Sequence, residues 1–457
     1  MPTSAFTRRS LLTASLGLGL VTATGCHVIK GGVGDVKDVG GLSKDPAPGR
    51  AVTIEWYNQF GAASGRALVR LAAQFEQIQD RIAVKVTYAP QATADVQARL
   101  LTALAAEDPP DVGFVIPEGA TQLAAHGVMT DLAPYLARDG FGEQDFLAPV
   151  WKQMADGPHI WATRLMLDVN FPLYWNKELF KKSDLDPEAG PKTVDDVERM
   201  SKKILRRNGN QVTTAGMTPW GFYGYSNSMF TWGFAFGGSF LSEDGQQVTA
   251  DHPNNVTALE WMADYAKSVG GADRVSVAPP GSNLPPIALG HLGMQPMTTP
   301  DLQLVRSAAP KLELGFTDVP YADGMGRPGS ATWLGGWGLF IPSKAKQPHA
   351  AWEFVKWLTL SPEGTTASFR EGSNLPTVKT SPAAALAAKD ADSAPYVAAL
   401  ERATNTRPNI PVSTALFSEM EIVVANAVYG GQTAKSALKQ ASDTANAAWD
   451  KFRKENQ

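Results

Sequence analysis

The sequence has little of the chemistry that holds metals, nucleotides or disulfides. Cys26 is the only cysteine among 457 residues, so the chain can form no internal disulfide. Its six histidines are scattered singly, without the spacing of a zinc site. No glycine-rich phosphate loop of the GxxxxGK(S/T) type occurs. We therefore predict no metal and no cofactor, and a fold held by its hydrophobic core alone.

The chain also lacks an excess of basic residues. Its formal net charge is −4, with 41 Lys and Arg against 45 Asp and Glu. The first 26 residues contain two arginines and no acid, so a chain without them would be more acidic still. This balance argues against a nucleic-acid partner and against a basic surface that binds membranes.

No apolar run reaches the roughly 20 residues that a membrane-spanning helix needs. The longest candidate, residues 11–21, follows two consecutive arginines and precedes the motif ATGC, which ends at Cys26. A positive start, a short apolar segment and small residues before a cut are typical of a secretory signal peptide. The arginine pair resembles a twin-arginine export signal, and ATGC resembles a bacterial lipobox, whose cysteine carries lipid. We predict a lipoprotein signal peptide over 1–26 and a protein anchored through Cys26 to the outer face of the cell membrane.

The segment after the cysteine differs from the rest of the chain. Residues 27–50 are rich in glycine and show no hydrophobic period, which predicts a flexible tether. The roughly 400 residues that follow exceed what one hydrophobic core commonly holds, which favours two domains or lobes.

Strand and helix patterns alternate at the start of the folded part. Residues 52–57, 81–88 and 111–116 have the pattern of strands, and 66–78 and 95–108 have the pattern of amphipathic helices. This order predicts a parallel sheet of an α/β fold. Ligands of such sheets bind beyond the carboxyl ends of the strands, here at residues 56–59 and 117–118. Further helices are predicted within 193–207, 254–270, 349–360 and 434–454.

Several later segments carry a family likeness. LYWNKELFKKSDLDPEAGPKTVDDVERMSKKI, then WLGGWGLFIPSKAKQPHAAWEFVKWL, then RPNIPVSTALFSEMEIVVANAVYGGQTAKSALKQA occur in this order. Together they resemble the family 1 solute-binding proteins of ABC sugar importers. The last segment is similar to the C-terminal part of maltodextrin-binding proteins. The likeness covers nearly the whole chain after residue 50.

The resemblance implies a two-lobed periplasmic-binding-protein fold of the Venus-flytrap type. Ligand would bind in the cleft between the lobes, and the closed form would be presented to the permease subunits of the importer. No bond would be made or broken, so we predict a monomeric binding protein and not an enzyme. The expected hinge crossings lie near 162–167, 291–296 and 357–361. The expected lobes are 51–165 plus 290–356 and 166–289 plus 357–457.

A sugar ligand would need flat aromatic rings beneath it and hydrogen-bonding groups around it. The chain has 12 tryptophans, and four of them lie in loops or at strand ends: Trp56, Trp232, Trp333 and Trp337. The last two flank Gly335 and Gly336, where bare backbone could approach a ligand. We predict that these aromatic residues and glycines contact the ligand, although packing within the lobes is the competing explanation.

Polar residues near the same loops complete the predicted site. They are Asn58, Gln59, Glu118, Asn227, Asn374 and Arg407. Arg407 opens RPNIP, a segment that supplies a ligand-binding arginine in some relatives. Phe417 falls where maltodextrin-binding relatives carry a stacking aromatic. In relatives an acid often stands directly at the end of the third strand, whereas here Ile116 holds that place and Glu118 follows two residues later.

Two alternatives to a sugar-binding protein stay open. An exported glycosidase would need two carboxylates facing each other across the cleft. A binding protein for a glycerophosphodiester or another non-sugar solute would be expected to bring an arginine or lysine into the cleft.

Overall fold

The structure is a computed structural model that describes residues 41–89, 108–275, 277 and 284–455. Cys26, the predicted signal peptide and all but the last residue of the predicted helix 95–108 lie outside this part. Among the described helices, none combines the length and the apolar character that a bilayer crossing requires. The described residues belong to one compact unit, Asp38–Gln457.

The N-terminal elements follow the predicted alternation. Strand β1 (Val52–Asn58) pairs in parallel with β2 (Ile82–Tyr88), and α2 (Ala62–Ile78) connects them. Strand β3 (Gly113–Val115) follows, and a parallel bridge from Val112 joins it to β1. The predicted parallel arrangement of these strands is therefore confirmed.

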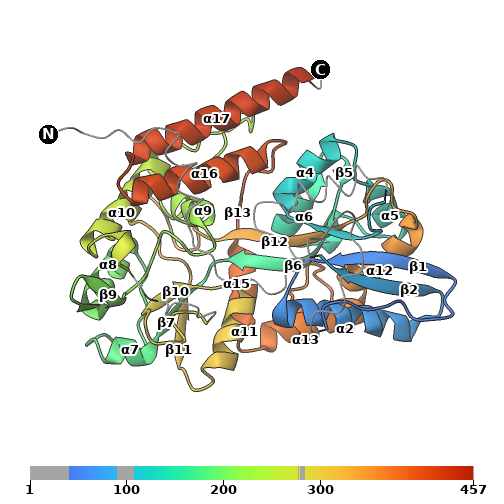
Figure 1. Ribbon diagram of the computed structural model, residues 1–457, viewed down its shortest axis with the longest axis horizontal. Coiled ribbons are helices and arrows are strands. Elements are labelled where there is room, and N and C mark those ends of the chain that lie inside the picture. Colours follow the sequence, from blue (N-terminus) through green and yellow to red (C-terminus); the bar gives the residue numbers. More distant parts are fainter. Residues whose placement is uncertain (1–40, 90–107, 276, 278–283, 456–457) are drawn as a thin grey trace, which may run out of the picture. The chain divides into compact units, whose positions relative to one another are not determined.

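A second sheet lies at the centre of the described chain (Figure 1). Strand β12 (Trp333–Phe340) pairs antiparallel with β6 (Thr163–Asn170) and with β3, and parallel with β13 (Asn405–Thr406). A further sheet places β7 (Leu173–Asn176) between two antiparallel partners, β10 (Met294–Pro296) and β11 (Leu314–Thr317).

The remaining elements cover these sheets or connect them. The helices are α4 (Pro117–Ala125), α5 (Ala133–Arg138), η2 (Glu143–Asp145), α6 (Ala148–Met154), α7 (Lys177–Lys181), α8 (Val194–Ile204), α9 (Tyr225–Ala235), α10 (Pro253–Ser268), η3 (Ala272–Arg274), α11 (Thr299–Ala308), α12 (Pro348–Leu360), α13 (Pro362–Gly372), α14 (Pro382–Lys389), α15 (Ala394–Arg402), α16 (Ser413–Val428) and α17 (Ala434–Glu455). The short strands are β4 (Ala155–Asp156), β5 (His159–Ile160), β8 (Arg206–Asn208) and β9 (Gln211–Thr214).

The local sequence determines where two of the helices, α8 and α13, begin. Thr193 accepts a hydrogen bond from the backbone N–H of Asp196, whose side chain returns a bond, so α8 begins with a full capping box. Ser361 caps α13 by accepting a hydrogen bond from the Gly364 N–H. These polar caps satisfy backbone donors that the helix itself leaves unpaired.

Most buried apolar side chains fall into two clusters. The first core joins β1, β2, β6, α12 and α15 through residues such as Ile54, Val84, Leu167, Phe354 and Tyr396. The second core joins α8, α9, α10, α16 and α17 through residues such as Met200, Phe230, Met262, Leu416 and Trp449. A smaller cluster around Val115, Leu123 and Phe340 attaches α4 to β3 and β12, both of which also contribute to the first core.

The chain passes between the two cores at places that differ in part from the predicted hinges. It moves into the second core after Val169 and contributes Ile287, Leu302 and Val305 to the first core on the way. It returns to the first core again between Trp333 and Leu334. It crosses again between Ala403 and Ile410. The crossing expected near 357–361 lies inside the first core instead, because α13 packs beside α2, where Arg70 pairs with Glu371 at 2.6 Å. Helices α13 to α15 thus pack with the first core, although we expected them in the other lobe.

The end of the predicted tether is also part of the fold. Lys44 bridges Val86 of β2 and forms an ion pair of 2.6 Å with Glu76. Leu42 is buried, and its carbonyl accepts a hydrogen bond from Asn58. Residues 41–50 are therefore anchored to the first core and are not a flexible linker.

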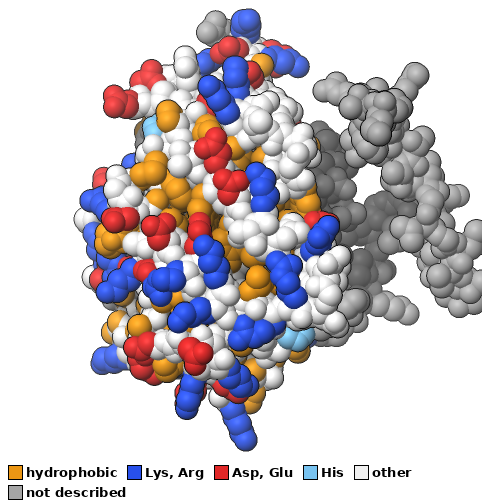
Figure 2. All heavy atoms as spheres, turned by 90° about the vertical axis from the view of Figure 1, so that its left-hand side faces the viewer, with side chains coloured by type: hydrophobic (Ala, Val, Ile, Leu, Met, Phe, Trp, Pro, Cys, Tyr) orange, Lys and Arg blue, Asp and Glu red, His pale blue; other side chains and the backbone are white. Residues whose placement is uncertain are grey.

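Acidic and basic side chains lie next to each other on the face shown in Figure 2. This face is the left-hand side of Figure 1, where elements of the second core lie. Its mixed charge agrees with the near balance of acids and bases in the composition.

Candidate ligand-binding site

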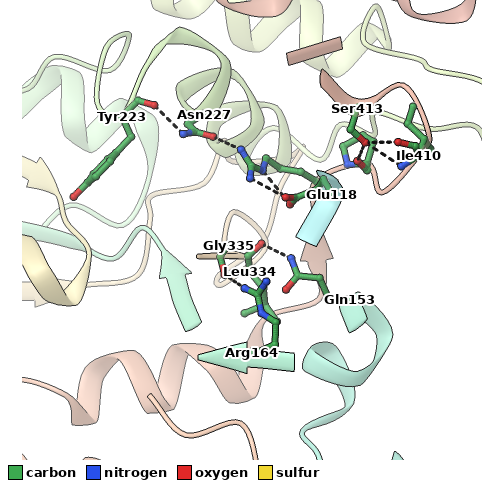
Figure 3. A network of polar contacts seen from close by, with 11 residues as sticks. Glu118, Gln153, Arg164, Tyr223, Asn227, Leu334, Gly335, Ile410 and Ser413 are labelled. Atoms are coloured by element: carbon green, nitrogen blue, oxygen red, sulfur yellow. Dashed lines mark hydrogen bonds and ion pairs between the residues drawn. The ribbon is translucent and has the colours of Figure 1, made fainter. Parts of the chain in front are cut away.

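Four of the predicted site residues meet around a fifth, Arg407. Arg407 follows β13, and Glu118 lies in the first turn of α4. Asn227 comes from α9, Trp333 from the start of β12 and Phe417 from α16. Figure 3 shows the polar part of this cluster, which draws on elements of both cores.

Two hydrogen bonds hold the guanidinium of Arg407 against a carboxylate. Its Nε donates to Glu118 Oε1 at 3.1 Å, and its Nη2 donates to Glu118 Oε2 at 2.9 Å. The Glu118 side chain is fully buried, and the Arg407 side chain is 10% exposed. Such a bidentate, charge-assisted pair fixes the direction of both groups.

A third bond ties the same arginine to the second core. Arg407 Nη1 donates to Asn227 Oδ1 at 2.9 Å, and Asn227 Nδ2 donates to the Tyr223 carbonyl at 2.8 Å. Arg407 therefore bridges α4, on the side of the first core, and α9, in the second.

The guanidinium also lies against two aromatic rings. Its Cζ is 4.9 Å from the ring centroid of Trp333 and 4.7 Å from that of Phe417, which are cation–π distances. Trp333 is held by a hydrogen bond of 3.0 Å from its Nε1 to Thr231 Oγ1. The cluster thus combines aromatic surfaces with polar donors and acceptors, the combination that a polyhydroxyl ligand requires.

The glycines between the two tryptophans serve the sheet. A Cβ on Gly335 would lie 2.1 Å from Asn170 Nδ2. A Cβ on Gly336, whose φ is +91°, would lie 2.0 Å from the Met166 carbonyl oxygen. These positions need glycine because β6 and β12 pack closely, so the sheet by itself accounts for both glycines, and their contact with a ligand stays a prediction.

Sequence reasoning missed two charged residues of β6. Arg164 is buried and donates from Nη2 to the Gly335 carbonyl, while its Nε and Nη1 have no partner among the described residues. Nearby, Gln153 donates to the Leu334 carbonyl at 3.0 Å, so two side chains support this stretch of β12 (Figure 3). The second charged residue, Asp168, is opposite Gly335 in the strand register. The alternation of TRLMLDVN, which places Arg164 and Asp168 on one face, was the available signal.

Burial changes the acidity of these groups. It lowers the pKa of Arg164 to about 10, because a charged guanidinium is poorly solvated there. It raises the pKa of Asp168 to about 7, although the positive charge of Arg164 opposes the shift. It also raises the pKa of Asp301 to about 6, against hydrogen bonding from Thr298.

Two predicted contact residues belong to the cores instead. Trp56 is fully buried, with its ring 5.6 Å from Phe114 and 5.1 Å from Phe354. Trp232 is fully buried and donates from Nε1 to the Pro219 carbonyl at 2.7 Å. Both rings face apolar side chains of their own cores, which favours packing, the competing explanation, and ligand contact by either ring stays a prediction.

Asn58 also has a structural role. It is fully buried, donates to the Leu42 carbonyl at 2.9 Å and accepts from the Phe60 N–H at 3.0 Å. These bonds shape the turn after β1. Asn374 donates to Ser368 Oγ at 3.0 Å at the end of α13.

Two other predicted residues lie apart from the arginine cluster. Gln59 is half-buried just after β1, where we expected it, and Trp337 is half-buried within β12. The Trp337 ring meets Phe60 edge-on at 5.5 Å. Their contact with a ligand stays a prediction.

Within the described residues, no three His, Cys, Asp or Glu side chains gather in a way that could hold a metal ion. The one acid of the arginine cluster, Glu118, is already paired with Arg407.

Comparison with known proteins gives the family. A model described as bacterial extracellular solute-binding protein matches residues 61–365. The chain therefore belongs to the family 1 bacterial extracellular solute-binding proteins. Members of this family bind substrates and are not enzymes, in agreement with the predicted function class.

Solved structures show the same fold. The chain resembles CpMnBP1 with mannotriose bound, with a TM-score of 0.75 and 22% identity over 86% of this chain and all of that one. It resembles maltose-bound MalE3 of T. maritima, with a TM-score of 0.71 and 22% identity over 87% of this chain and all of that one. It also resembles the GacH receptor of Streptomyces glaucescens, with a TM-score of 0.71 and 20% identity over 89% of this chain and all of that one. The two-lobed periplasmic-binding-protein fold is thus confirmed.

Curated relatives match over a shorter stretch. One is a probable amino-acid ABC transporter periplasmic-binding protein, y4oP, of Sinorhizobium fredii, 26% identical over 199 residues. Another is the sn-glycerol-3-phosphate-binding periplasmic protein UgpB of Agrobacterium fabrum, 27% identical over 194 residues. Each match spans 40% of this chain and 40% of the relative.

Proposed function

We propose that this protein captures a sugar or oligosaccharide between its two cores and delivers it to the permease of an ABC importer. The proposal rests mainly on the cluster of Arg407, Glu118 and Asn227 beside the rings of Trp333 and Phe417. Fixed hydrogen-bonding groups next to aromatic faces suit a ring that is apolar on its faces and hydroxylated at its rim. Because the cluster draws on both cores, a ligand bound there would favour closure.

The structural neighbours support a carbohydrate. Those named above are described with mannotriose, maltose and acarbose bound. Their identities to this chain are 20–22%, so they guide the choice of compounds to test and do not name the ligand.

A glycerophosphodiester is the second candidate. The UgpB relatives are named for sn-glycerol 3-phosphate, the phosphate monoester of the same class, and Arg407 offers a guanidinium for such a group. Glu118 already neutralises that arginine through two hydrogen bonds, which weakens the attraction for a phosphate. The sugar is therefore the preferred class.

A thermal-shift and calorimetric panel tests the choice. The full chain is mixed with maltose, mannobiose, mannotriose and glycerol 3-phosphate in turn. A ligand at 100 times its dissociation constant should stabilise the protein by about 2.7 kcal/mol. Stabilisation by glycerol 3-phosphate alone would transfer the proposal to the second candidate, and no response to any sugar would contradict the first.

The family is extracellular, and the UgpB relatives are periplasmic. We propose that lipid on Cys26 retains this protein at the membrane, beside its permease. Cys26→Ser should move the protein from the membrane fraction to the soluble fraction, because no other thiol is present. Retention of the processed Cys26→Ser variant in the membrane fraction would refute the anchor.

A further inference from the structure

One face of α4 makes polar contacts with a single segment far away in the sequence. Glu118, Thr121 and Gln122 stand at positions i, i+3 and i+4 of the helix, so their side chains share a face. Glu118 pairs with Arg407 as described above. Thr121 Oγ1 donates to Asn409 Oδ1 at 2.8 Å.

The third contact extends this row. Thr414 Oγ1, at the start of α16, donates to Gln122 Oε1 at 2.8 Å. We call the six residues the α4 seam: Glu118, Thr121, Gln122, Arg407, Asn409 and Thr414.

The two sides of the α4 seam belong to different hydrophobic clusters. On one side, Ala120 and Leu123 bury α4 against Val115 and Phe340, next to the first core. On the other side, Ile410 and Leu416 anchor the 407–414 segment and α16 in the second core. The seam therefore links the second core to α4, and α4 is attached to the first core through β3 and β12.

We propose that the α4 seam is a latch that sets the balance between the closed and open arrangements of the two cores, and this inference rests on the proposed function. The bonds of the seam stabilise the closed arrangement, and the contacts of a ligand with both cores would stabilise it further. If the latch is weak, more of the ligand's binding free energy is needed to close the protein, and the apparent affinity is lower.

The chemistry of the seam suits a contact that opens. Its bonds are polar, so on opening they can be exchanged for bonds to water at a small net cost. The apolar residues Ala120 and Leu123 of α4 are buried in the smaller cluster with Val115 and Phe340, away from the seam. Contacts between bodies that move are commonly more polar than the cores of those bodies.

A distance measurement between the cores tests the latch. In the full chain carrying Cys26→Ser, dyes are attached at Ile78→Cys in α2 and Ile422→Cys in α16. These side chains are 58% and 56% exposed and lie on elements of different cores. Single-molecule energy transfer then gives the ratio of closed to open molecules, with and without sugar.

The seam variant is Thr121→Val with Gln122→Ala, which leaves the buried ion pair intact so that the fold is retained. Removing two hydrogen bonds should lower the closed-to-open ratio without sugar by at least about fivefold. The matched control is Thr366→Val with Gln440→Ala. Thr366 bonds within α13, and Gln440 bonds Glu419 at 2.6 Å between α17 and α16, so neither contact joins the cores. The control should leave the ratio unchanged.

The outcomes separate the latch from the function. If sugar closes parent and seam variant alike, and their ratios without sugar are equal, the latch is refuted and the function stands. If the seam variant opens but no sugar changes the ratio in any protein, the latch stands and the proposed function fails. If seam variant and control shift equally, the effect is general destabilisation, and the latch is refuted.

Discussion

The buried ion pair between Glu118 and Arg407 permits a quantitative test of the site. Glu118→Gln keeps the size of the side chain but removes the charge that faces a guanidinium only 10% exposed. Two charge-assisted hydrogen bonds, at 3.1 and 2.9 Å, lose most of their strength. Leaving one charge of a buried pair without its partner costs about 3–5 kcal/mol of stability. The free energy of unfolding of a whole domain is about 5–15 kcal/mol, so this loss of stability should be a large fraction of the total.

A double-mutant cycle in urea isolates the pair. Glu118→Gln, Arg407→Met and the double variant are compared with the parent chain. We expect each single change to destabilise strongly and the double change to cost clearly less than their sum, with a coupling of at least about 2 kcal/mol. Coupling of this size requires that both charges are removed from water, as their burial indicates.

The matched control is an ion pair in water. Lys439 and Asp443 pair at 2.8 Å on α17, with side chains 61% and 64% exposed. Their cycle should give about 0.5 kcal/mol or less, because solvent screens both charges. If the Glu118–Arg407 coupling were no larger than this, the pair would not be buried as described, and the account of the site would be wrong.

Three further predictions concern the second core, the central sheet and the acid Asp168. Trp232→Ala should destabilise the protein by about 3–5 kcal/mol in urea, since it empties a core position; a variant of parent stability would show that the ring is not packed. Gly336→Ala should be far more destabilising than Gly430→Ala, because both have positive φ but only the first Cβ would meet backbone, the Met166 carbonyl at 2.0 Å; equal thermal midpoints would contradict this. For Asp168, the folded-state pKa of about 7 exceeds the unfolded value of about 3.9, so its contribution to stability is full below pH 4 and is lost as the pH rises to about 7. The urea midpoint of the parent should therefore fall more between pH 4.5 and pH 7.5 than that of Asp168→Asn. Equal changes of the midpoint in both proteins would refute the raised pKa of Asp168.

Local sequence signals predicted much of the framework. The period of α2 and the strand patterns of β1 and β2 act within a few residues, and the structure shows each element in place. The crossing expected near 357–361 was wrong because it depends on whether α13 packs beside α2 or on the second core. That choice concerns surfaces far apart in the chain, which no local pattern records.

For the site, the sequence by itself determined which residue types were available: an arginine in RPNIP, an acid after the third strand, and tryptophans in loops. It also carried the family likeness through the order of its motifs. Only the tertiary structure decided which of them meet. Arg407 lies beside Glu118, Asn227, Trp333 and Phe417 because four separate elements converge there. The tryptophans separate for the same reason, since a ring becomes core or site according to the surface that packs against it, and that surface comes from distant parts of the chain.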